Sequence, residues 1–132
     1  MSMNRRQFVA GLPVSLLLSA QVAQASPSGL GIIFVAQSTC PYCAVIAPIL
    51  AQLRDEGGVD VIVASMNAAP VAPFPTFEDG RQNPLTAHFT SVPQVLIYNE
   101  RLGQVTHEIG GVRTLRHFIT RLSLSLQQAS AL

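Results

Sequence analysis

Two cysteines separated by two residues, Cys40 and Cys43, are the only cysteines of this 132-residue sequence. The apolar and β-branched run before them, 31–36, is typical of a buried strand. After them, apolar side chains recur at helical spacing until Gly57 and Gly58, which predict the end of a helix. Cys40 is therefore predicted to lie where a strand ends and a helix begins.

A thiol at the start of a helix is well placed for redox chemistry. Unpaired backbone N–H groups and the positive end of the helix dipole favour an anion there, which makes Cys40 the expected nucleophile. Pro41 suits the first helical position, because its missing N–H is not needed there. Cys43 follows one turn later on the inward side, close enough to bridge to Cys40. The pair predicts a redox-active disulfide, Cys40–Cys43, in which Cys40 attacks and Cys43 resolves the mixed disulfide.

Other uses of a Cys-x-x-Cys pair stay open at this point. Zinc usually takes four ligands, and the sequence has no second cysteine pair. An inert structural disulfide usually closes a longer loop, where the entropic gain is larger. Copper(I) binds soft thiolates, but no methionine or histidine lies beside this motif. We therefore predict neither a bound metal nor another cofactor.

The rest of the chain alternates between strand-like and helix-like patterns. A second buried strand at 59–64 completes a strand–helix–strand unit, whose two strands should run parallel. In the long proline-rich loop 66–83, Phe74 and Phe77 either tie the loop to the core or form part of a substrate surface. The later predicted elements are a short helix at 84–89 capped by Asn83, a strand at 95–98, a hairpin turn at 99–103, an edge strand at 104–109 and an amphipathic helix from Leu115 onward.

Three motifs together resemble the thioredoxin superfamily. They are Cys40-Pro41-Tyr42-Cys43 between a strand and a helix, Ser91-Val92-Pro93-Gln94 ahead of a strand, and Gly110-Gly111 ahead of the last helix. The resemblance covers nearly all of the chain after residue 28. It implies an α/β, thioredoxin-like fold with a roughly four-stranded mixed sheet and helices on both faces.

The resemblance also implies roles for single residues around the two catalytic cysteines. Pro93 corresponds to the cis-proline of the family, and Val92 before it offers its backbone to the substrate. Pro41 and Tyr42 between the cysteines, together with Pro93, would support the active site.

The sequence differs from thioredoxins at one position and from glutaredoxins at another. Phe34 replaces the buried acid that thioredoxins keep six residues before the first cysteine, and Val112-Arg113 replaces the glutathione-binding acids of glutaredoxins. Instead, the segment from Phe77 to Arg81, running into 85–93, resembles the thioredoxin-like TraF/TrbB group of conjugative plasmid transfer. That group helps to fold disulfide-bonded pilus and transfer proteins.

Residues 1–25 are predicted to be an export signal, which leaves a thioredoxin-like domain at 26–132. Arg5-Arg6 resembles a twin-arginine signal, and Ala23-Gln24-Ala25 resembles a cleavage site ahead of Ser26. The apolar segment between them is short for a membrane span, so we expect no stable membrane insertion after cleavage. An uncleaved membrane anchor is the alternative. Export predicts a location in the periplasm, an oxidising compartment.

The charge balance argues against nucleic acid as a partner. The chain has eight basic and seven acidic residues, and two of the basic ones belong to the predicted signal. No basic cluster for nucleic acid or anionic lipid is left in the predicted domain.

The sequence as a whole predicts a periplasmic thiol–disulfide oxidoreductase, an enzyme that reduces or isomerises protein disulfides. Its partners would be cysteine-containing client proteins of the periplasm and a membrane electron donor. Two alternatives stay open: a copper(I)-binding chaperone, and a non-catalytic thioredoxin-like component of a conjugation or secretion assembly.

Overall fold

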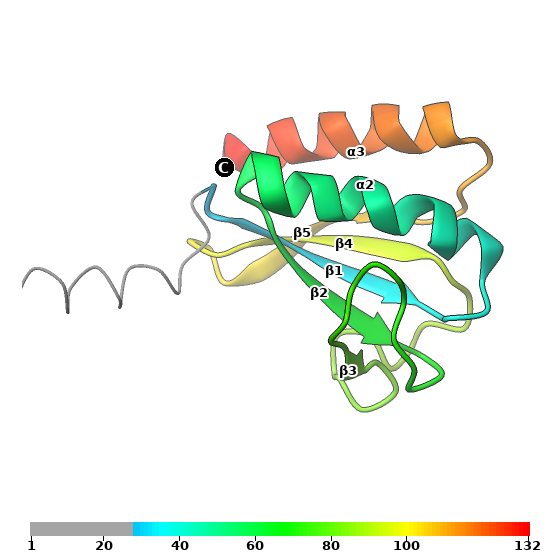
Figure 1. Cartoon of the computed structure of the whole chain (residues 1–132). Helices are drawn as coiled ribbons and strands as arrows, with labels where there is room; N and C mark the ends of the chain where they lie inside the picture. The colour runs from blue at the N-terminus through cyan, green and yellow to red at the C-terminus, as the bar shows by residue number, and fades with distance from the viewer. Residues whose placement is uncertain (1–27) are drawn as a thin grey trace, which may run out of the picture.

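Five strands form one mixed sheet in the order β3–β2–β1–β4–β5 (Figure 1). The computed structural model describes residues 28–132, and the predicted export signal at 1–25 lies outside them. In chain order the elements are β1 (Leu30–Ala36), α2 (Pro41–Gly57), β2 (Asp60–Ser65), β3 (Glu78–Asp79), β4 (Gln94–Asn99), β5 (Gln104–Ile109) and α3 (Leu115–Ser130).

The predicted strand–helix–strand unit is present. β1 is buried along its whole length and pairs in parallel with β2, with α2 as the connection. On its other side β1 pairs antiparallel with β4, and the hairpin after β4 adds β5 at the edge. The thioredoxin-like α/β fold expected from the resemblance is therefore confirmed.

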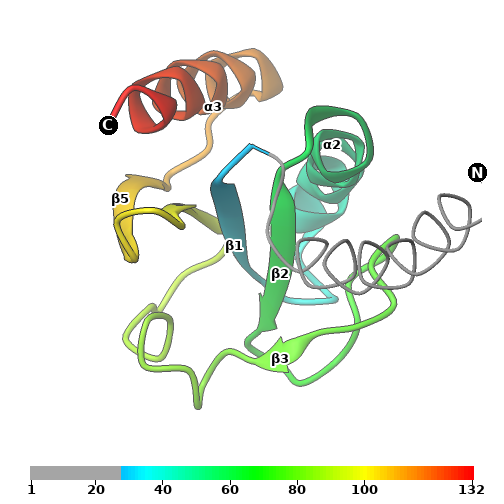
Figure 2. The same cartoon turned by 90° about the vertical axis from the view of Figure 1, so that its left-hand side faces the viewer.

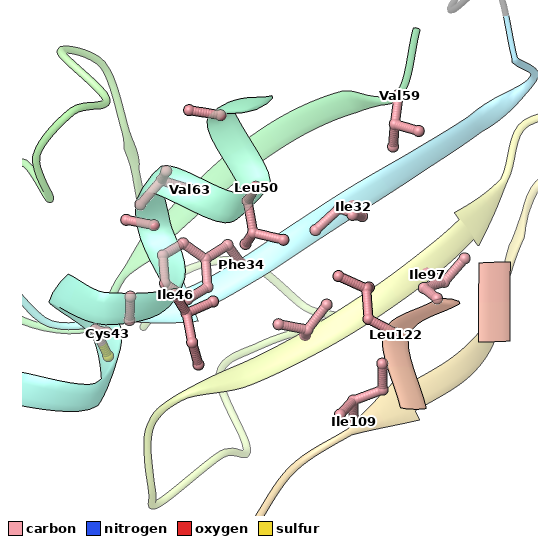
Figure 3. Packing of buried hydrophobic residues seen from close by; sticks show 14 of the residues in the cluster. Ile32, Phe34, Cys43, Ile46, Leu50, Val59, Val63, Ile97, Ile109 and Leu122 are labelled. Atoms are coloured by element: carbon pink, nitrogen blue, oxygen red, sulfur yellow. The ribbon is translucent and has the colours of Figure 1, made fainter. Parts of the chain in front are cut away.

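Both helices lie on the same face of the sheet, side by side (Figures 1 and 2). Their inward side chains, such as Leu50 and Leu122, join one cluster with Ile32, Phe34 and Ile97 from the sheet (Figure 3). None of the helices within residues 28–132 is long and apolar enough to cross a membrane.

The expectation of helices on both faces is thus wrong for residues 28–132. The opposite face has a smaller cluster of Ile33, Ala64 and Leu96, which Phe89 and Val105 cover in part. The predicted helix at 84–89 would lie there, but the segment forms only a hydrogen-bonded turn. Asn83 caps this turn as expected, since its Oδ1 accepts a 2.9 Å hydrogen bond from the Leu85 N–H.

The long loop contributes a fifth strand that the four-stranded prediction lacks. The two residues of β3 pair in parallel with Ala64 and Ser65 at the end of β2. Phe74 ties the loop to the main cluster and is only 4% exposed, whereas Phe77 is 38% exposed. Of the two roles predicted for these rings, Phe74 therefore takes the anchoring one.

Candidate active site

Cys40 is the N-cap of α2, at the predicted junction. Its backbone is extended, and Pro41 occupies the first helical turn. The Cys40 Sγ accepts a hydrogen bond of 3.2 Å from the Cys43 N–H, which satisfies one of the unpaired donors of the helix start. Both cysteines are free thiols in this structure, with Cys40 half-buried and Cys43 buried.

Cys43 lies one turn further on and is 0% exposed. Burial is the main cause that raises the pKa of the Cys43 thiol to about 12, and the hydrogen bond with Cys40 raises it further. A backbone hydrogen bond from Gln37 acts in the opposite direction. Phe34, which is also 0% exposed, occupies the sequence position of the thioredoxin acid, and no carboxylate contributes to this pKa. Cys43 is therefore a neutral thiol near pH 7.

Pro93 lies at the same end of the sheet as Cys40. The Val92–Pro93 peptide bond is cis, as the resemblance implies. Gln94 pairs with Val35, which places Pro93 beside the end of β1, from which the chain runs on to Cys40. Val92 and Cys40 are both partly buried against the main hydrophobic cluster. Within residues 28–132, the backbone N–H and C=O groups of Val92 have no hydrogen-bond partner.

The other two predicted site residues are exposed around the thiol. Tyr42 is 51% exposed, and Pro41 is exposed beside it. The cysteine motif and the Val92–Pro93 segment thus lie at one end of the sheet.

Asn67 holds the cysteine loop in place, although no pattern in the sequence indicates this role. Its Nδ2 donates to Ser38 Oγ at 2.7 Å, and its Oδ1 accepts from the Ser38 N–H at 3.3 Å. The same Oδ1 lies 3.0 Å from the hydroxyl of Ser65, which is 0% exposed. The next residue, Ala68, has a φ of 53°, a region that side chains rarely adopt. Asn67 therefore links the end of β2 to the segment just before Cys40.

A sharp turn follows β5 on the other side of the site. Gly110 lies so close to Gln94 that a Cβ there would overlap the Gln94 side chain, and Gly111 has a φ of 62°. Val112 then packs against the main cluster, and Thr114 caps α3 by accepting a 3.1 Å hydrogen bond from the His117 N–H. This turn brings Arg113 to the end of the molecule that holds Cys40.

Residues 28–132 contain no group of three or more histidine, cysteine or acidic side chains that could hold a metal ion. The arrangement consists instead of an accessible thiol, a shielded thiol and a free backbone edge. It has the parts needed for exchange between a thiol and a disulfide.

Comparison with known proteins gives one family match. A family described as "TraF: F plasmid transfer operon protein" matches residues 19–119. A search of curated proteins found no significant match.

Solved structures with the same fold are more distant in sequence. Oxidised thioredoxin O2 from Arabidopsis thaliana is 20% identical, over 86% of each chain, with a TM-score of 0.51. The short form of thioredoxin f from spinach chloroplast is 17% identical, over 81% of this chain and 83% of that chain, with a TM-score of 0.55. MTB DsbF, in mixed oxidised and reduced forms, is 19% identical, over 75% and 81%, with a TM-score of 0.52. These similarities establish the thioredoxin fold.

Proposed function

This chain belongs to the family of TraF, the F plasmid transfer operon protein, and on that premise we propose that it is a periplasmic thiol–disulfide oxidoreductase. Its clients are proteins with cysteines, whose disulfides it reduces or isomerises. One observation carries the proposal: Cys40 is accessible at the N-cap of α2, while Cys43 one turn later is fully buried. An attacking thiol needs access to the substrate and a resolving thiol needs shielding from it.

In the reductive direction, the Cys40 thiolate attacks one sulfur of a client disulfide. A mixed disulfide forms, and the other client sulfur leaves as a thiolate that takes up a proton. Cys43 then gives its proton to water and attacks Cys40 Sγ, which releases the second client thiol and closes the Cys40–Cys43 disulfide. The client has gained two electrons, so a thiol donor must reduce Cys40–Cys43 before the next turnover. We assign that task to a membrane electron donor, because the periplasm is oxidising.

Val92 and Pro93 orient the client in this proposal. A client segment adds as an extended strand to the unpaired backbone of Val92, as in other cases of strand addition. Pro93 ends the chain's own pairing there, because proline has no N–H to donate. Pro41 and Tyr42 form the exposed rim over which the client approaches.

Trapping of mixed disulfides tests the proposal. Cys43→Ala should accumulate mixed disulfides with client proteins, because the resolving thiol is gone, while Cys40→Ala should accumulate few. Equal trapping by the two variants, or the reverse order, would contradict the assigned roles. If neither variant traps clients and the wild-type protein binds copper(I) with both thiolates, the chaperone alternative is correct. If conjugation or secretion still proceeds when both cysteines are replaced, the non-catalytic alternative is favoured.

The reduction potential decides the direction of the reaction. Pro41 and Tyr42 bring no charge to the helix start, so we expect a value of roughly −200 mV, less reducing than thioredoxin at about −270 mV. Equilibration of the purified protein with glutathione buffers measures it. A value near −120 mV would instead indicate an oxidase of client thiols.

A further inference from the structure

We propose that Arg113 and Arg116 form a basic docking surface beside Cys40, which selects clients that carry aspartate or glutamate next to the target disulfide. This inference rests on the proposed function and deepens it, because it names the chemical class of client.

Both arginines lie at the end of the molecule that carries Cys40. Val35 pairs with Gln94 and Val95 pairs with Ile109, so the end of β1, the start of β4 and the end of β5 meet at one edge. Cys40 follows β1 by four residues, and Arg113 follows β5 by four. The neighbour of Arg113, Val112, packs against the same cluster as Cys40. Helices α2 and α3 both begin at this end (Figures 1 and 2).

Neither arginine is neutralised by an acid within residues 28–132. Both are exposed, and the ion pairs in this part of the chain are Arg54–Asp55 and Arg81–Asp79. From residue 109 to the end of the sequence there is no acidic residue at all. The two guanidinium groups are therefore available to carboxylates of another molecule.

The acidic residues lie on another face, edge or end of the sheet than the two arginines. Glu108, the nearest in sequence, pairs with Leu96, which belongs to the cluster on the face away from the helices. Glu78 and Asp79 pair with the end of β2 and so lie at the same end of the sheet as Cys40, but on β3, the edge strand opposite β5, and Asp79 is already bonded to Arg81. The remaining four are at or near the opposite end, where α2 ends and β2 begins, or in the hairpin after β4: Asp55, Glu56, Asp60 and Glu100.

The helices add to the positive potential at this end. Neither α2 nor α3 has an acidic residue in its first turn, so the positive ends of both dipoles are uncompensated. Exposed charges act chiefly on the rate at which partners meet, and salt screens them. An acidic client segment should therefore react with Cys40 about tenfold faster than a basic one at low salt.

Three disulfide peptides test the inference. They contain the same internal disulfide and differ only in the flanking residues, which are glutamate, glutamine or lysine. The rate constant for their reduction by the reduced protein is measured by chromatography at low and high salt. Arg113→Glu/Arg116→Glu tests the surface. Arg121→Glu is the control: it is the same exchange at a single exposed position further along α3, with half the change of net charge. Thermal unfolding establishes that each variant is folded.

We expect the order glutamate, glutamine, lysine for the wild-type protein, with the difference lost at about 1 M salt. Arg113→Glu/Arg116→Glu should reverse the order, and Arg121→Glu should keep it. Equal rates for the three peptides, or an order that the double substitution leaves unchanged, would overturn the inference while the proposed function stands. If none of the peptides is reduced by the wild-type protein, the proposed function itself fails.

Discussion

At the scale of single residues, the protonation of Cys43 should govern how fast a client is released. Burial is the main cause that raises the pKa of Cys43 to about 12, and Cys43 stays buried when Cys40 is bonded to a client in a mixed disulfide. Below its pKa, a thiol gains about tenfold in thiolate fraction for each pH unit. We therefore expect release of the client from the mixed disulfide to accelerate about tenfold per unit between about pH 6 and 9.

Stopped-flow mixing of reduced protein with a fluorescent disulfide peptide measures this step. The attack by Cys40 forms a separate, earlier phase and serves as the internal reference. A release rate that levels off near pH 7 would show that Cys43 ionises far more easily than its burial implies. An acid or base from outside the described residues would then have to assist it.

Asn67 provides a second prediction at this scale, because its amide makes two hydrogen bonds to Ser38. Asn67→Ala frees the segment before Cys40, and we expect client reduction to slow several-fold. The free energy of unfolding should fall by only about 1–2 kcal/mol, as for the loss of ordinary hydrogen bonds.

Ser38→Ala supplies the control for Asn67. It removes the shorter of the two bonds, so alone it should slow the reaction less than Asn67→Ala. Added to Asn67→Ala, it should change almost nothing, because that bond is already lost. Additive effects in this double-mutant cycle would show that Asn67 acts through other contacts.

At the scale of elements, the loop 66–83 should depend on one anchor. Phe74 is 4% exposed in the main cluster, and the Arg54 guanidinium lies 5.1 Å from the centre of its ring. We expect Phe74→Ala to lower the free energy of unfolding by about 3–5 kcal/mol, the usual cost of a large cavity. Phe77→Ala, at a ring that is 38% exposed, is the matched control and should cost less than about 1 kcal/mol. Urea denaturation measures both, and equal losses would refute the anchoring role.

The elements that could be predicted from the sequence carry their own local signal. Such a signal is present in the apolar runs of β1 and β2 and in the helical spacing after Cys43. Each of these segments must bury its apolar side chains, whichever segment it packs against. β3 has no such signal, since its two residues form a strand only because β2 lies beside them. The face on which a helix packs also depends on contacts between distant segments. The local pattern therefore does not reveal that α2 and α3 share one face of the sheet (Figures 1 and 2).

The same distinction holds for the candidate site. Cys40, Cys43 and Pro93 stand in motifs whose spacing indicates their positions. Asn67 and Ser38 are 29 residues apart, and no spacing rule connects them. Their contact arises because β2, parallel to β1, ends beside the segment that leads to Cys40.

At the scale of the whole molecule, redox work in the periplasm requires that the chain be exported. The predicted signal has two adjacent arginines, Arg5 and Arg6, whose planar guanidinium groups lysine does not reproduce. We expect Arg5→Lys/Arg6→Lys to leave the precursor uncleaved in the cytoplasm, although the charge is unchanged. The wild-type chain should yield a mature protein that begins at Ser26, as mass spectrometry of the periplasmic fraction would establish. Arg54→Lys, the same exchange at an exposed site on α2, should not affect export. Normal processing of the double lysine variant would show that another route exports the chain, and a wild-type protein that keeps residues 1–25 would favour the membrane anchor.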